Sequence, residues 1–128
     1  MQNNSSAKKI LIIEDEVFIS ELYTRALNRA GYQTDCIIDG VKALKKAQEN
    51  NYDIILLDLM IPNLTGIEIL RKLKDPNITP NFTSKIIVAT NLEERDKVRK
   101  DIEQQADGYI VKAELTPSQL VDFIRTIQ

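Results

Sequence analysis

The sequence contains no histidine and only one cysteine, Cys36, among its 128 residues. One cysteine cannot form an intramolecular disulfide, and without histidine the chain lacks the usual ligands for zinc. Any metal site must therefore be built mainly from oxygen ligands. A chain of this kind suits a reducing compartment, and we expect a cytoplasmic location.

The chain also lacks a positive-charge excess and long apolar runs. Its 17 Lys and Arg residues face 19 Asp and Glu residues, which gives no basic footprint for nucleic acid or an anionic membrane. No segment approaches the roughly 18 uninterrupted apolar residues of a membrane span, and the polar N-terminus has no signal-peptide core. No Gly-x-Gly-x-x-Gly motif follows the first apolar segment, which counts against a dinucleotide site. We therefore expect no direct nucleic-acid binding by this chain and no membrane association.

What the sequence does contain is 43% hydrophobic residues, enough for the core of a single domain. We expect a flexible tail over residues 1–7 and one domain over residues 8–128. Within that domain, short β-branched segments alternate with segments of helical periodicity. The predicted strands cover residues 9–14, 32–38, 52–60, 85–90 and 108–112.

A helix is predicted after each of these strands. The first carries an apolar stripe that ends before Gly31, and Asp39 is a plausible N-cap of the second. Capping boxes at residues 65–68 and 116–119 begin the third and fifth helices. The fourth, over about residues 92–105, has few apolar anchors, chiefly Val98, Ile102 and Ala106. Five strand–helix units predict an α/β fold, (βα)5, whose parallel sheet is covered by helices on both faces.

Polar residues stand at the carboxyl ends of the predicted strands, where ligands bind to such sheets. They are Glu14, Asp15, Asp58, Thr90 and Lys112. Three carboxylates in a small space repel one another, so a cation or protons must compensate them. Oxygen ligands without histidine or cysteine favour Mg²⁺, and a carboxylate beside a metal-bound phosphoryl donor can form an acyl phosphate. Lys112 and the Thr90 hydroxyl are placed to contact the equatorial phosphoryl oxygens.

Several of these residues have simpler interpretations. Asp15 is as well explained as a cap of the first helix, where Glu16 favours the helix dipole. Thr90 and Asn91 each stand three residues before a glutamate, so either can begin the fourth helix as a capping box. A purely structural interpretation is weakest for Asp58, because it ends the most apolar strand, where an unpaired acid is costly.

The segments IIEDE (12–16), LLDLMIPNLTG (56–66), VAT (88–90) and GYIVK (108–112) occur in this order. Together they make residues 8–127 resemble the receiver domains of bacterial two-component response regulators. The resemblance implies a flavodoxin-like, doubly wound sheet with strand order 2-1-3-4-5. It implies phosphorylation on Asp58 by a phosphohistidine of a sensor histidine kinase or histidine phosphotransfer protein. It also implies a Mg²⁺ site whose direct ligands are Asp15, Asp58 and the Met60 carbonyl, with Glu14 acting through water. The phosphoryl group would be contacted by Lys112 and Thr90, and the switch residues would be Thr90 and Tyr109.

On this basis we expect a phosphorylation-switched signalling receiver of a two-component phosphorelay. It is not expected to be an enzyme, beyond assisting its own phosphorylation and dephosphorylation. Phosphorylation is expected to shift the fourth helix, fifth strand and fifth helix and so change partner binding, with a homodimer through the fourth and fifth helices as one candidate assembly. The alternative is a phosphorylation-independent pseudo-receiver that acts as a protein-interaction module. A haloacid-dehalogenase-like phosphatase is disfavoured, because it usually carries a second aspartate where this chain has Met60.

The sequence departs from the commonest receiver pattern at several positions. Glu14 replaces a more frequent aspartate, Asn91 stands where alanine or glycine usually follows the threonine, and Ala113 replaces a proline. Because a cis bond before alanine costs about 2.5 to 4 kcal/mol, the bond between residues 112 and 113 is predicted to be trans. Met60 and Leu92 are apolar where relatives often carry polar residues, which predicts a long-lived phosphoryl group.

Overall fold

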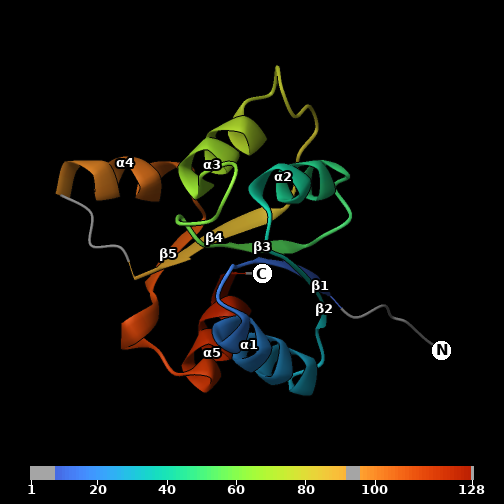
Figure 1. Cartoon of the computed structure of the whole chain (residues 1–128), viewed down its shortest axis with the longest axis vertical. Coiled ribbons are helices and arrows are strands. Elements are labelled where there is room, and N and C mark those ends of the chain that lie inside the picture. Colours follow the sequence, from blue (N-terminus) through green and yellow to red (C-terminus); the bar gives the residue numbers. More distant parts are fainter. Residues whose placement is uncertain (1–7, 92–95, 128) are drawn as a thin grey trace.

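The computed structural model describes residues 8–91 and 96–127, so the tail predicted for residues 1–7 lies outside the described residues. The strands are β1 (Lys9–Ile13), β2 (Gln33–Ile37), β3 (Ile54–Leu57), β4 (Lys85–Thr90) and β5 (Gly108–Val111). The helices are α1 (Val17–Arg29), α2 (Gly40–Gln48), α3 (Gly66–Lys74), α4 (Asp96–Gln105) and α5 (Pro117–Ile127), and a 3-10 turn, η1 (Lys112–Glu114), follows β5. The strands form one parallel sheet in the order β2-β1-β3-β4-β5 (Figure 1). The predicted α/β fold and strand order are thus confirmed.

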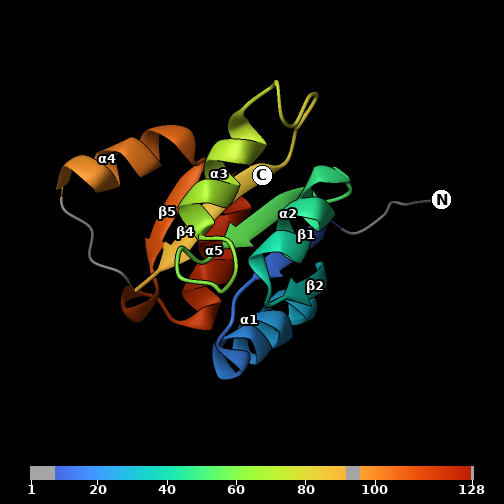
Figure 2. The same ribbon diagram turned by 45° about the horizontal axis from the view of Figure 1, so that its top comes forward.

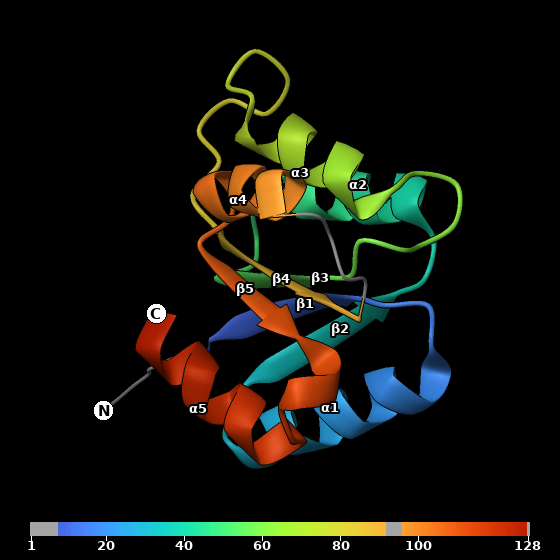
Figure 3. The same cartoon turned by 90° about the vertical axis from the view of Figure 1, so that its left-hand side faces the viewer.

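The molecule has three layers, with α2, α3 and α4 on one face of the sheet and α1 and α5 on the other (Figure 3). Alternate residues of each central strand point to opposite faces. In β1, Leu11 and Ile13 pack beneath α2 and α3, whereas Ile10 and Ile12 pack against α1 and α5. All four are fully buried, and this is why the strand is a continuous apolar run rather than an alternating one.

The helix boundaries follow the capping signals in the sequence. The Asp39 side chain accepts a 2.8 Å hydrogen bond from the Lys42 amide at the start of α2. Thr65 caps α3, and the residues at positions 116 and 119 form reciprocal capping bonds at the start of α5. Gly31, just past α1, has a φ of 102°, a left-handed conformation that glycine adopts at low cost. These four predictions are confirmed.

The strands carrying the polar residues end earlier than predicted. β3 ends at Leu57 rather than at residue 60, β1 ends at Ile13, and Lys112 begins the turn η1 instead of closing β5. Asp58 still donates its backbone N–H to the Ile13 carbonyl at 3.0 Å, but the chain then leaves the sheet. The site residues therefore lie mainly in the loops that follow the strands. Side chains in these loops do not have to point alternately to the two faces of the sheet.

Helix α4 lies at the β5 edge of the sheet, with α3 between it and α2 (Figure 2). The structure describes it from Asp96 onward, and residues 92–95 of the predicted helix lie outside the described residues. Ile102 is buried and Ala106 is partly buried, but Val98 is 38% exposed, so its prediction as an anchor is wrong. The amino-terminal part of α4 extends past the β5 edge of the sheet (Figure 2). Within the described residues, no helix is both long and apolar enough to cross a membrane.

Candidate functional site

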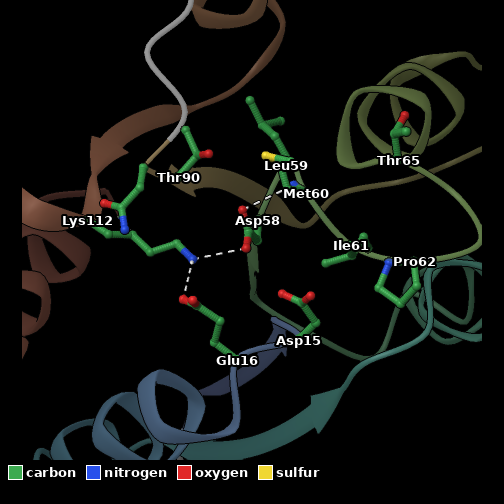
Figure 4. A pocket seen from close by; sticks show the side chains of 11 residues that line it. Asp15, Glu16, Asp58, Leu59, Met60, Ile61, Pro62, Thr65, Thr90 and Lys112 are labelled. Atoms are coloured by element: carbon green, nitrogen blue, oxygen red, sulfur yellow. Dashed lines mark hydrogen bonds and ion pairs between the residues drawn. The ribbon is translucent and has the colours of Figure 1, made fainter.

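The parallel sheet gathers the predicted polar residues at its carboxyl edge. Glu14 follows β1, Asp58 follows β3, Thr90 ends β4 and Lys112 follows β5. All four are at most 8% exposed, whereas Asp15 is exposed. A pocket opens over Asp58, with Lys112 reaching into it from one side and Asp15 from below (Figure 4). The polar residues predicted at the strand ends therefore form one compact cluster at this edge of the sheet.

Lys112 links the acids. Its Nζ donates hydrogen bonds to Oε1 of Glu14 at 2.5 Å and to Oδ2 of Asp58 at 2.9 Å. Glu16, which is largely exposed, lies at 4.0 Å from the same ammonium (Figure 4). The buried carboxylates thus share one cation supplied by the chain, and this meets the requirement that buried charges be paired.

The Asp58 carboxylate is held from two sides. Its Oδ1 accepts a hydrogen bond of 3.2 Å from the Met60 backbone N–H, and its Oδ2 accepts the bond from Lys112. The loop after β3 is itself braced, because Gly66 donates its backbone N–H to the Leu59 carbonyl at 3.0 Å. A Cβ on Gly66 would lie only 2.3 Å from the Asp58 carbonyl oxygen. Glycine at this position therefore lets the first turn of α3 sit directly behind Asp58.

A second glycine supports the same loop from α2. Gly40 donates its backbone N–H to the Pro62 carbonyl at 3.0 Å, and a Cβ there would meet the Leu64 backbone. Asn63, with a φ of 73°, donates a side-chain hydrogen bond to the Asp39 cap. The loop that carries Asp58 and Met60 is thus fixed at both of its neighbouring helices.

Burial and charge set the protonation of the cluster. Burial raises the pKa of Glu14 to about 7; its hydrogen bond from Lys112 lowers the value, and the nearby charge of Asp58 raises it. Burial alone would lower the pKa of Lys112, but the hydrogen bonds to Glu14 and Asp58 outweigh it and raise that pKa. The cluster therefore holds its protons tightly, as expected where several carboxylates share a small volume.

The same residues fit a divalent cation. Glu14, Asp15 and Asp58 each offer a carboxylate oxygen, and these oxygens lie within 4.8 Å of one another. Three carboxylates and one ammonium leave a formal charge of 1 − 3 = −2, which one divalent ion would balance. An all-oxygen set suits Mg²⁺, which uses few carboxylates and retains water in its shell.

The simpler interpretations have different outcomes. Glu16, not Asp15, occupies the N-cap position of α1, and no side-chain hydrogen bond caps that helix. The capping interpretation of Asp15 is therefore wrong. The proposed capping of the fourth helix by Thr90 or Asn91 involves residues 92–95, outside the described residues.

The peptide bond between Lys112 and Ala113 is trans, as predicted.

Tyr109 lies apart from the pocket. It packs against the core beneath α4, and the Arg99 guanidinium lies over its ring at 4.6 Å from the centroid. No sequence signal predicts this contact, because Arg99 is one of many charged residues on a polar helix. The hydrogen bond from the Ala113 N–H to Asn91 Oδ1, at 2.9 Å, joins two positions at which the sequence departs from the receiver pattern, and no local sequence signal predicts it.

The comparisons with known proteins agree with this geometry. The family model described as the response regulator receiver domain matches residues 10–125. The chain is 41% identical to the response regulator ArlR of Staphylococcus saprophyticus over 81% of this chain and 45% of the relative. It is 36% identical to the transcriptional regulatory protein ResD of Bacillus subtilis over 93% of this chain and 47% of that protein. The chain therefore spans about half the length of these curated relatives.

Solved structures show the same similarity. The chemotaxis protein CheY4 of Vibrio cholerae superposes with a TM-score of 0.81 at 27% identity, covering 96% of this chain and all of that one. The receiver domain of the Francisella response regulator 1452 superposes with a TM-score of 0.79 at 27% identity, covering 94% and 95% of the two chains. With the family model spanning most of the sequence, the chain belongs to the response regulator receiver domain family.

Proposed function

We propose that residues 8–128 form one receiver domain, which accepts a phosphoryl group on Asp58 from the phosphohistidine of a sensor histidine kinase or histidine phosphotransfer protein. One observation carries this proposal. A buried carboxylate is held toward an open pocket by Lys112, with two further acids beside it. A purely structural ion pair would need neither the additional acids nor the opening.

The chemistry follows from these positions. An Asp58 carboxylate oxygen attacks phosphorus in line, the phosphorus–nitrogen bond of the phosphohistidine breaks, and the imidazole leaves as the P–O bond forms. Lys112 contacts a phosphoryl oxygen and offsets its negative charge, and the Thr90 hydroxyl donates a hydrogen bond to another. Positioning and charge compensation catalyse this phosphoryl transfer. We expect the chain to turn over no small-molecule substrate.

The metal would be held by the acids around Asp58. Asp15, Asp58 and the Met60 carbonyl are the proposed direct ligands, with Glu14 acting through water. When bound, Mg²⁺ supplies positive charge that offsets the repulsion between the carboxylates and the incoming phosphoryl oxygens. Glu14 must release its proton for this role, and Lys112 must share its hydrogen bonds with the phosphoryl group.

Exposed apolar residues beside the pocket support a protein as the donor. Phe18 is 71% exposed, Val17 58%, Ile38 51% and Met60 61%, and each stands just after a strand's carboxyl end or in the first turn of α1. Apolar side chains around a polar pocket suit contact with another protein surface. Met60 also presents no polar side chain to orient water, so we propose a long-lived phosphoryl group.

The proposed switch involves β5 and the helices on either side of it. After phosphorylation, Thr90 moves toward the phosphoryl group and Tyr109 turns inward, and the resulting shift of α4, β5 and α5 changes partner binding. Support comes from the weak attachment of α4, whose described residues contribute only Ile102 to the buried core, with Ala106 packed against it. An element held by few apolar contacts moves at low cost.

The proposal is tested with beryllofluoride, an analogue of the phosphoryl group, and Mg²⁺. We expect amide shifts in the NMR spectrum at Thr90, Tyr109 and Lys112 and throughout α4, and no such shifts in Asp58→Asn. A pseudo-receiver that works without phosphorylation would show neither the binding nor the shifts. Slow amide exchange in α4, equal to that of the sheet and unchanged by beryllofluoride, would reject the proposed switch.

A further inference from the structure

The hydrogen bond between Asn91 and Ala113 continues the pairing of β4 and β5 beyond the sheet. Thr90 and Val111 are the last paired residues of these strands. β4 ends at Thr90, and one residue beyond Val111 the chain of β5 enters η1. Just past this last pair, Asn91 Oδ1 accepts a hydrogen bond from the Ala113 N–H at 2.9 Å, so a side chain links the two segments where the backbone pairing stops.

The bond has a clear physical role at η1. The first N–H groups of a helical turn have no partner within that turn, and an outside acceptor must supply one. Asn91 provides that acceptor for Ala113, the second residue of η1. A backbone N–H can only donate, so this contact also fixes which end of the Asn91 amide faces η1. The proline more common at position 113 has no N–H and could not make this bond.

The bonded residues directly follow two residues of the pocket. Thr90 precedes Asn91, and Lys112 precedes Ala113; Thr90, Asn91 and Lys112 all line the pocket over Asp58. The candidate metal ligands, in contrast, lie after β1 and β3. A link between β4 and β5 therefore acts on the side of the pocket that carries the hydroxyl and the ammonium.

We propose that Asn91 is a positioning residue that holds Thr90 and Lys112 at the spacing required to receive the phosphoryl group. The inference rests on the proposed function of Asp58. Asn91 acts through the Ala113 N–H and so sets the position of the backbone that bears Lys112. Because the link is present before any phosphoryl group arrives, it organises these two contacts in advance, which lowers the cost of binding.

The test uses Asn91→Leu, which keeps most of the side-chain bulk and removes the acceptor. Asn51→Leu is the matched control, because Asn51 is exposed and precedes the amino end of β3, at the edge of the sheet opposite Asp58. We expect Asn91→Leu to bind beryllofluoride, at saturating Mg²⁺, about three- to tenfold more weakly than wild type, as loss of one hydrogen bond predicts. Its affinity for Mg²⁺ alone should stay within about twofold of wild type, and Ala113 amide exchange should accelerate. Asn51→Leu should match wild type in all three measurements.

A double-mutant cycle with Ala113→Pro separates the hydrogen bond from other effects of the substitution. Proline removes the donor, so Asn91→Leu should cause no further loss of beryllofluoride affinity in that background. Unchanged beryllofluoride affinity in Asn91→Leu, an equal loss of Mg²⁺ affinity, or the same loss with Ala113→Pro would each overturn the inference. If wild type itself fails to bind beryllofluoride, the proposed function fails, and this inference fails with it.

Discussion

Lys112 donates a hydrogen bond of 2.9 Å from its Nζ to Oδ2 of Asp58, across the carboxyl edge of the sheet. The same ammonium bonds Glu14, so a single cation serves two buried carboxylates. In this arrangement Lys112 compensates the acids before any metal or phosphoryl group is present. Its position also explains how a sheet can end in adjacent acids without losing stability.

Replacing Lys112 with methionine should therefore destabilise the metal-free protein. Removal of one partner of a buried ion pair leaves an uncompensated charge, and we expect a loss of about 3 kcal/mol in the free energy of unfolding. Urea denaturation in EDTA measures the loss. Lys46→Met is the control, because Lys46 forms an exposed pair with Glu49 and should change stability by less than about 1 kcal/mol. Equal stabilities for the two variants would contradict the proposed role of Lys112.

Glu14 should make the stability of the metal-free protein depend on pH. Its pKa is raised from 4.5 to about 7 in the folded state. Between these values the folded state binds more protons than the unfolded state, so the free energy of unfolding should fall as pH rises. We expect a fall on the order of 1 to 3 kcal/mol from about pH 5 to about pH 8.

Glu14→Gln provides the comparison for this pH dependence, since glutamine resembles the protonated carboxyl and does not titrate. Urea unfolding in EDTA across the same range should give a flatter profile for the variant. Added Mg²⁺ should restore wild-type stability at the higher pH, because binding favours the deprotonated carboxylate. Parallel profiles for wild type and variant would exclude Glu14 as the titrating group.

Gly66→Ala should disturb both the fold and the site. The added Cβ would lie 2.3 Å from the Asp58 carbonyl oxygen and 2.5 Å from the Leu59 Cα, so the backbone beside the acid must move. We expect a destabilisation of about 1 to 3 kcal/mol and weaker Mg²⁺ binding. Gly31→Ala is the matched control: its φ of 102° strains alanine, but its Cβ meets nothing within 4 Å. That variant should lose stability, by about 1 kcal/mol, and keep its Mg²⁺ affinity. If calorimetry shows the same Mg²⁺ affinity for both variants, the close packing behind Asp58 does not position the site.

Arg99→Ala should ease the inward turn of Tyr109. The guanidinium lies 4.6 Å from the ring centroid and is itself held by Glu103 at 2.8 Å. An exposed cation–π contact contributes about 0.5 to 1 kcal/mol, so its loss should increase the inward population of the ring about two- to fivefold. Fluorotyrosine NMR, with Tyr109→Phe to assign the signal, measures that population before and after beryllofluoride is added. The control Arg125→Ala, on α5, should leave the inward population of the Tyr109 ring unchanged. An identical Tyr109 signal in wild type and Arg99→Ala would show that the contact does not restrain the ring.

Much of the fold was predictable because the signals are local. The continuous apolar runs of β1 and β3 require burial on both faces, and the caps at Asp39 and Thr65 mark where helices begin. Once the strands are parallel, topology alone brings Glu14 and Asp58 to the same edge. The ends of the strands were less predictable, because Leu59 and Met60 are apolar but belong to a loop.

The contacts that tune the site were not predictable, because they join residues far apart in the chain. The bond of Lys112 to Glu14 spans 98 positions, and the raised pKa of Glu14 depends on the burial that results. Asn91 and Ala113 were each visible as departures from the receiver pattern. Only the structure shows that they bond to each other.

Acetyl phosphate charging, read by intact mass spectrometry, tests whether the acids at this edge serve phosphoryl transfer. In the presence of Mg²⁺ the protein should gain the mass of one phosphoryl group, and EDTA or Asp58→Asn should abolish the gain. A protein that stays unmodified while its Mg²⁺ site is full, or an Asp58→Asn variant that is charged like wild type, would contradict the proposed role of Asp58.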